Sequence, residues 1–132
     1  MAFKYQLCDG YIKLTLIGTV TFDDLKQVLK RLAEDELQLP VTPHRITDLS
    51  DANFSDISSE HLVAVAEIRR NAKLKNKVKS ALIATRPEQY GLARMFMGHN
   101  QNPDITIMVF KDSDSAYNWI GAESESDDRP DA

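Results

Sequence analysis

The chain has 132 residues, of which 42% are hydrophobic and 27% are charged. This length suits one domain with a single core, and the composition is that of an ordinary globular protein. No apolar run approaches the ~18 residues that a membrane-spanning helix needs. Cys8 is the only cysteine, and the first residues lack the apolar segment of a signal peptide, so we expect a cytoplasmic location without disulfides.

The net charge of −4 is concentrated at the C-terminus. Residues 122–132 carry five acidic residues and one basic residue, so residues 1–121 are neutral overall. The acidic segment has almost no apolar content from which to build a core. We therefore expect a single domain over residues 1–121, followed by a disordered acidic tail at 122–132.

Six basic residues of the neutral part fall within eleven positions: Arg69, Arg70, Lys73, Lys75, Lys77 and Lys79. The simplest interpretation is a solvated helix end, where the helix dipole favours cations. The alternative is a docking patch for anionic lipid or for an acidic partner. We do not expect a nucleic-acid partner, because no aromatic residue is interleaved with these bases.

Hydrophobic periodicity predicts nine elements in chain order. Apolar residues alternate with polar ones at 3–7 and at 12–16, which predicts two strands joined by the turn pair Asp9-Gly10. A capping-box pattern at Thr21 then begins a helix. Further on, we expect a strand at 44–49, a helix capped by Ser58 or Ser59, a strand at 78–85 that is buried on both faces, a helix at 86–97, a strand at 105–110 and a helix that begins at 112–114.

This order of elements predicts the topology. Strands that alternate with helices are parallel, and their crossovers are right-handed. If consecutive strands are neighbours, the crossover helices lie on one side of the sheet. The predicted fold is α/β: a five-stranded mixed sheet with an N-terminal antiparallel hairpin, then a right-handed parallel β-α superhelix, with four helices mainly on one face. Polar residues of the first strands predict a wet or partner-facing second face: Lys4, Gln6, Lys13, Thr15, Arg45 and Thr47.

The predicted helix at 86–97 is unusually apolar. On a wheel of 100° per residue its apolar residues cover more than half of the circle, whereas a helix on one sheet face needs only about 100°. One interpretation is burial by several neighbours or by a dimer mate. The other is that part of the arc lines a pocket or faces a membrane or partner. Methionine adapts to varied apolar shapes, and Gly91 and Gly98 lower helix stability, which suits a movable lid.

Catalytic and metal-binding patterns are weak in this chain. His44, His61 and His99 do not stand at a recognisable ligand spacing, and no Gly-rich phosphate loop is present. Cys8 in a predicted strand is best read as a small buried hydrophobe. We therefore expect neither an enzyme, nor a metal site, nor a cofactor.

Four groups of residues resemble the SpoIIAA-like family of the STAS-domain superfamily, over about residues 3–121. They are Asp48-Leu49-Ser50 ending a strand, Ile57-Ser58-Ser59-Glu60 opening a helix, Tyr90-Gly91-Leu92-Ala93-Arg94-Met95-Phe96, and Phe110-Lys111-Asp112 leading to Ala116 and Trp119-Ile120. The resemblance implies a SpoIIAA/STAS-like fold, related in shape to the lipid-carrying Sec14-type domains. It also implies an apolar-ligand or membrane-associating role.

Sporulation anti-anti-sigma factors of the same superfamily carry a phosphorylated serine in an Asp-Ser-Ser-Gly motif at a helix start. The matching segment here runs from Asp56 to Glu60, with one residue inserted after the Asp and Glu60 in place of the glycine. Glu60 would repel an added phosphate. We interpret Ser58 and Ser59 as capping residues, with a regulatory role as the alternative.

The sequence thus predicts a bacterial, non-catalytic module that binds a small apolar or amphipathic, lipid-like ligand, or associates peripherally with a membrane surface. The predicted binding residues belong to the Met/Phe-rich helix, in which Arg94 supplies charge: Tyr90, Leu92, Arg94, Met95, Phe96 and Met97. The alternative is a STAS-type regulatory protein–protein interaction module that works from the helix start at Ser58 and Ser59. A homodimer through the Met/Phe-rich helix fits either hypothesis.

Overall fold

The computed structural model describes residues 2–121, so the predicted tail at 122–132 lies outside the described residues. Five strands form one sheet in the order β1-β2-β3-β4-β5. The first pair is antiparallel, and every later pair is parallel. The strands are β1 (Ala2–Leu7), β2 (Tyr11–Thr19), β3 (His44–Asn53), β4 (Val78–Ile83) and β5 (Ile105–Phe110).

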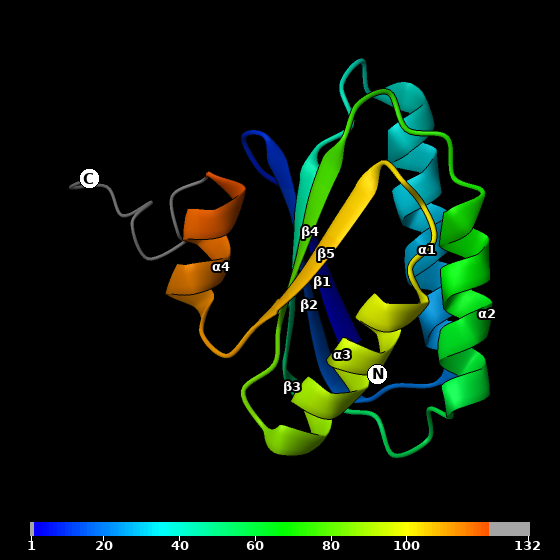
Figure 1. Cartoon of the computed structure of the whole chain (residues 1–132), viewed down its shortest axis with the longest axis vertical. Coiled ribbons are helices and arrows are strands. Elements are labelled where there is room, and N and C mark those ends of the chain that lie inside the picture. The colour runs from blue at the N-terminus through cyan, green and yellow to red at the C-terminus, as the bar shows by residue number, and fades with distance from the viewer. Residues whose placement is uncertain (1, 122–132) are drawn as a thin grey trace.

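Three helices lie on one side of the sheet and the fourth lies on the other side (Figure 1). The first three are the crossover helices α1 (Phe22–Gln38), α2 (Ser59–Arg70) and α3 (Pro87–His99). Crossovers of one hand between neighbouring strands place their helices on the same face. The last helix, α4 (Ser113–Ile120), follows the final strand and is free of that constraint. The predicted fold class is confirmed, including the placement of the helices mainly on one face.

Local capping signals determine where the helices begin. Thr21 and Asp24 form a reciprocal capping box at α1, with N···O distances of 2.9 and 3.2 Å. At α2 the cap is Ser58, whose Oγ accepts from the backbone N–H of His61 at 3.2 Å. Asp112 caps α4 by accepting from the backbone N–H of Ser115 at 2.8 Å. These bonds satisfy N–H groups that a helix leaves without intrahelical partners.

The sheet separates two apolar clusters. The larger cluster lies between the sheet and α1, α2 and α3. The smaller one lies under α4 and is made by Tyr11, Ile46, Ala81, Ile83, Ala116, Tyr117 and Ile120. Residues 80–83 of β4 are accordingly buried on both faces, as predicted. On the α4 side, the polar residues of the hairpin remain at least partly exposed: Lys4, Gln6, Lys13 and Thr15.

The prediction of a wet face was wrong for Arg45 and Thr47. Side chains alternate along β3, and Ile46 occupies the face under α4. Arg45 and Thr47 therefore share the opposite face with Leu49, beneath the crossover helices. This change of face places a charged and a polar side chain inside the molecule.

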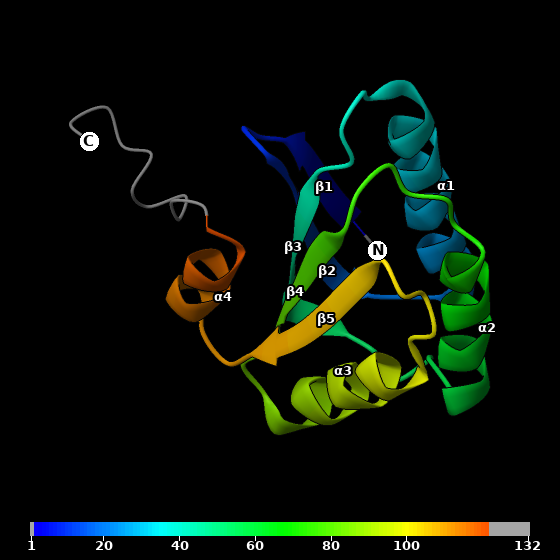
Figure 2. The ribbon, with the colours of Figure 1, turned by 45° about the horizontal axis from the view of Figure 1, so that its top comes forward.

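Side chain–backbone bonds fix both ends of α3, which lies beside β5 in Figure 2. Gln89 is only 2% exposed, and its Nε2 donates to the backbone oxygens of Ser50 at 3.1 Å and Ala52 at 2.9 Å. Beyond the other end, Asn100 Nδ2 donates to the backbone oxygen of Ile105 at 2.8 Å. The middle of α3 is thus held between a bond to β3 and a bond to β5.

We predict that Gln89→Met lowers the free energy of unfolding by about 1–3 kcal/mol, because a buried carbonyl oxygen of β3 loses its donor. The matched control is Gln27→Met, the same substitution at an exposed position of α1. Urea denaturation of both variants measures the difference. Equal stability of the two variants would contradict this account of the α3 attachment.

His44 should make stability depend on pH. Its Nδ1 accepts from the backbone N–H of Lys79 at 2.9 Å, and burial, followed by the Lys79 charge, lowers the pKa of His44 below its ordinary value of 6.5. The unfolded chain then binds the proton more readily, so stability is lost as the pH falls below about 6.5 and levels off below the folded-state pKa.

We expect His44→Asn, whose side-chain oxygen can accept the same bond without titrating, to reduce this loss. Urea denaturation of wild type and variant between about pH 7 and pH 5 measures the effect. Parallel pH profiles of the two proteins would show that His44 does not contribute.

Candidate ligand-binding cavity

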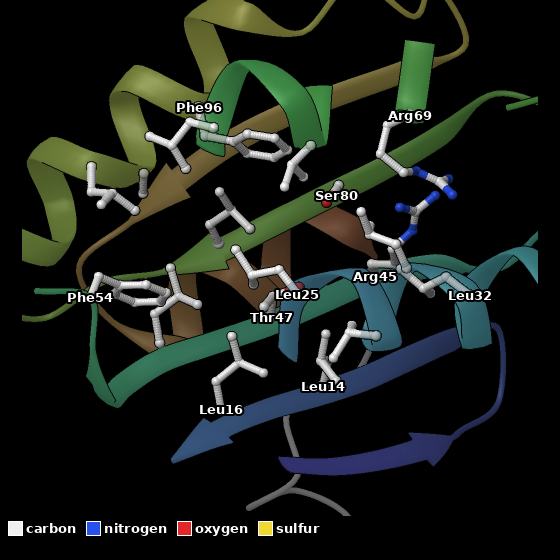
Figure 3. Close-up of a pocket in the computed structure, with 18 residues that line it drawn as sticks. Leu14, Leu16, Leu25, Leu32, Arg45, Thr47, Phe54, Arg69, Ser80 and Phe96 are labelled. Carbon is white, nitrogen blue, oxygen red and sulfur yellow. The ribbon is translucent and has the colours of Figure 1, made fainter. Parts of the chain in front are cut away.

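A cavity of about 120 Å³ lies between the sheet and the helices α1, α2 and α3 (Figure 3). Strands β2, β3 and β4 form its floor, and the three helices form its walls. Fourteen of its 18 lining residues are apolar, mostly leucines. An apolar cavity of about 150 Å³ is known to admit a benzene-sized molecule. The cavity is close to this volume and is open on one side, so it can admit the body of a small organic ligand.

The polar groups of the cavity are gathered toward one end. Figure 3 shows the guanidinium groups of Arg45 and Arg69 at that end, with Phe54 toward the other. Thr47 and Ser80 stand on the floor between them, and Ser80 is the neighbour of Arg45 in the β3–β4 register. Within residues 2–121, the hydroxyl groups of Thr47 and Ser80 have no hydrogen-bond partner. The cavity is thus amphipathic along its length.

The two arginines share one carboxylate, and we call Glu36, Arg45 and Arg69 the triad. Glu36 lies on α1 and is 5% exposed, while Arg45 and Arg69 are 7% and 5% exposed. Arg69 binds Glu36 through two nitrogens, with N···O distances of 3.0 and 2.6 Å. Arg45 Nη2 lies 3.0 Å from Glu36 Oε2. The triad therefore ties α1, α2 and β3 together in the interior.

The charges of the triad do not balance. Two guanidinium groups face one carboxylate, and the nearby Asp35 instead accepts from the Tyr5 hydroxyl at 2.5 Å. In the described part of the chain, Asp35 forms no ion pair with either arginine. Burial, and then the Arg69 charge, lower the pKa of Arg45 to about 10, which still leaves it protonated at neutral pH. One formal positive charge is left beside the cavity.

Some N–H groups of the triad also lack hydrogen-bond acceptors within residues 2–121. Arg69 Nε is buried, and no residue in the described range accepts from it. Arg45 donates from Nη2 alone within the same range. Buried N–H groups without acceptors are rare in folded proteins, because each one loses its water without compensation. The end of the cavity formed by the triad can therefore accept a ligand that supplies negative oxygen atoms.

The structure brings two of the six predicted binding residues into the cavity: Leu92 and Phe96. Tyr90 and Met97 are partly buried and pack on the adjacent core cluster, whereas Met95 is 46% exposed. Arg94 lies on the exposed side of α3, where its Nη1 is 3.4 Å from the Tyr90 hydroxyl. The predicted residues thus lie partly in the cavity wall and partly on the outer surface of the same helix.

The remaining predicted features lie away from the cavity. Ser58 and Ser59 are exposed at the start of α2, where Ser58 forms the cap. The interpretation of the basic cluster as a solvated group was wrong for Arg69, which points into the interior to reach Glu36. Lys75 Nζ donates to the backbone oxygens of Leu37 and Leu39, and Lys79 Nζ donates to that of Trp119. Arg69, Lys75 and Lys79 of the basic cluster thus each bind a different part of the chain.

Sequence reasoning missed the triad, although a signal for it exists. Glu36 follows Val28 and Leu32 at intervals of four residues, on the buried stripe of α1. Arg69 continues the buried stripe of α2 three residues after Ala66. Opposite charges at apolar positions of two neighbouring helices indicate a buried ion pair, because such groups are seldom fully buried unless they are paired.

Residues 2–121 contain neither a metal-binding cluster nor a membrane-spanning helix. No three His, Cys, Asp or Glu side chains in this range come together in a way that could hold a metal ion. None of the helices described here is long and apolar enough to cross a membrane.

A solved structure shares this architecture. It is described as an uncharacterized protein from the DUF3478 family with a SpoIIAA-like fold, from Shewanella loihica PV-4. The TM-score is 0.59 and the identity 15%, over 90% of this chain and 92% of that one. This chain has a SpoIIAA-like fold. The predicted resemblance is thereby confirmed at the level of the fold. No protein-family model matches the sequence, and no curated protein matches it either.

We predict that Glu36→Gln lowers the free energy of unfolding by about 3–5 kcal/mol, because it leaves two buried cations without their shared anion. Arg45→Met should be milder, since it leaves the two-bond Arg69–Glu36 pair electrically balanced. Urea denaturation of both variants measures the order. An Arg45→Met variant less stable than Glu36→Gln would contradict the charge imbalance.

Proposed function

We propose that this SpoIIAA-like protein is a non-catalytic binding module that takes up a small, mainly apolar ligand in the cavity beneath α3. The cavity is the observation that carries the proposal. Protein interiors are close-packed, and the voids that exist are small. At about 24 cal/mol per Å³, an unfilled apolar cavity of this size lowers stability by roughly 3 kcal/mol. A ligand that fills it recovers part of that free energy.

The middle of α3 is the proposed lid. Gly91 and Gly98 flank the segment that carries Leu92 and Phe96, and Gln89 and Asn100 fix the chain on either side. A Cβ atom added at either glycine would meet nothing within 4 Å. Close packing therefore does not require glycine at these positions. What glycine supplies here is a helix that opens more easily.

Filling the cavity with a larger side chain should abolish the uptake of a ligand. We expect toluene, a neutral molecule close to benzene in size, to raise the midpoint of thermal unfolding of the wild type. Ala93→Leu adds three carbons to the cavity wall and should remove this effect, because the added side chain takes the space of the ligand. Ala33→Leu, the same change on the exposed face of α1, is the control and should respond like the wild type. The proposal fails if toluene stabilises Ala93→Leu as much as it stabilises the control.

The lid makes a separate prediction about rates. We expect the double variant Gly91→Ala/Gly98→Ala to be more stable by up to about 2 kcal/mol, since alanine favours the helix by up to ~1 kcal/mol per site. Ligand entry and exit should both become slower, while the dissociation constant changes less than either rate. Line-shape analysis of a toluene titration followed by NMR measures both quantities. Unchanged rates in a stabilised variant would exclude α3 as the lid.

A further inference from the structure

We infer that the ligand of this cavity is a small monocarboxylate. Its carboxylate lies against Arg45 and Arg69, and its hydrocarbon part extends over the leucines toward Phe54 and Phe96. The inference rests on the proposed function and gives the chemical class of its ligand. Three properties of the triad and the cavity support it: the charge, the free donors and the shape.

The net positive charge of the triad favours the binding of one more anion. Both oxygens of Glu36 are engaged, Oε1 by Arg69 and Oε2 by both arginines. A buried cation without a counter-ion is unfavourable, because it loses its hydration and gains no attraction to an opposite charge in exchange. One added monoanion brings the group to electrical neutrality. A dianion would leave an excess of negative charge in the same buried place. The formal charges of the triad therefore favour a ligand with a single negative charge.

The free hydrogen-bond donors favour a ligand with oxygen atoms that act as acceptors. Arg69 Nε has no acceptor within residues 2–121, and Arg45 donates there from Nη2 alone. The hydroxyl groups of Thr47 and Ser80 stand on the adjoining floor. The planar donor fork of arginine matches the two oxygens of a carboxylate. A hydrocarbon would leave all of these donors unsatisfied, and an alcohol would satisfy only some of them.

The shape limits the apolar part. The polar end of the cavity and the end at Phe54 are separated by a floor of leucines that also carries Thr47 and Ser80 (Figure 3). The cavity has about four-fifths of the volume that admits benzene, so it holds about five carbon atoms of the hydrocarbon part. Because the cavity is not closed, the end of a longer chain can extend out of it. The ligand class is thus a short-chain or aryl-substituted carboxylic acid in its ionised form. Octanoate is a probe of this class, and 1-octanol is its uncharged match.

The experiment compares the two probes on the intact chain by isothermal titration calorimetry. We expect wild-type protein to bind octanoate at least about tenfold more tightly than 1-octanol. Arg45→Met should weaken octanoate at least about tenfold and weaken 1-octanol much less. Arg45→Lys, which keeps the charge but loses the planar fork, should give an intermediate affinity for octanoate. Arg70→Met, an exposed arginine next to Arg69 in sequence, is the control and should bind both probes like the wild type.

The outcomes separate the two proposals. Equal binding of octanoate and 1-octanol by the wild type would overturn the carboxylate inference and leave the proposed function standing. The same holds if Arg45→Met binds octanoate as the wild type does. Binding of neither probe by the wild type would count against the proposed function, and the inference would fall with it. Ser80→Ala, a small change that keeps the triad, provides a second variant and should weaken octanoate more than 1-octanol.

Discussion

The carboxylate of Glu36 is the constraint on which the interior of this protein depends. It joins three consecutive elements of the chain: α1, β3 and α2. Charges are seldom buried so deeply, because desolvation of each ion costs several kcal/mol unless close partners offset it. The triad meets this condition only in part, since one anion serves two cations. Its position also determines which end of the cavity is polar.

This incomplete balance connects stability with function. A core of matched apolar residues in place of the triad would be at least as stable, as replacements of buried ion pairs in other proteins indicate. An excess charge and a cavity both lower stability, and both lie at the same place between the sheet and its helices. Binding sites are places where proteins give up stability for function. A ligand that carries one negative charge and a small hydrocarbon body would relieve both costs at once.

The sequence was a good guide wherever the determinant was local. The Asp9-Gly10 turn, the cap at Thr21, the cap at Ser58 or Ser59, the helix start at 112–114 and the alternation of strands and helices are set by neighbouring residues. All of these were predicted, and the caps are Thr21, Ser58 and Asp112. The cavity could be predicted only in outline, through Leu92 and Phe96 in an overly apolar helix. Arg45 and Arg69 were predicted at solvated or partner-facing positions because their partner, Glu36, belongs to another element. Burial of a charge depends on partners that lie on other elements, and periodicity along one segment does not reveal them.

The most direct test of the central claim is the NMR signal of the Arg69 Nε–H group in ¹⁵N-arginine-labelled protein during an octanoate titration. This donor is buried and has no acceptor within residues 2–121. A carboxylate that binds as proposed gives it a charge-assisted hydrogen bond, so its proton resonance should move downfield as the site fills. 1-Octanol should leave it nearly unchanged. If octanoate shifts the methyl signals of the cavity leucines while the Arg69 signal stays in place, the ligand does not meet the triad, and the account is contradicted.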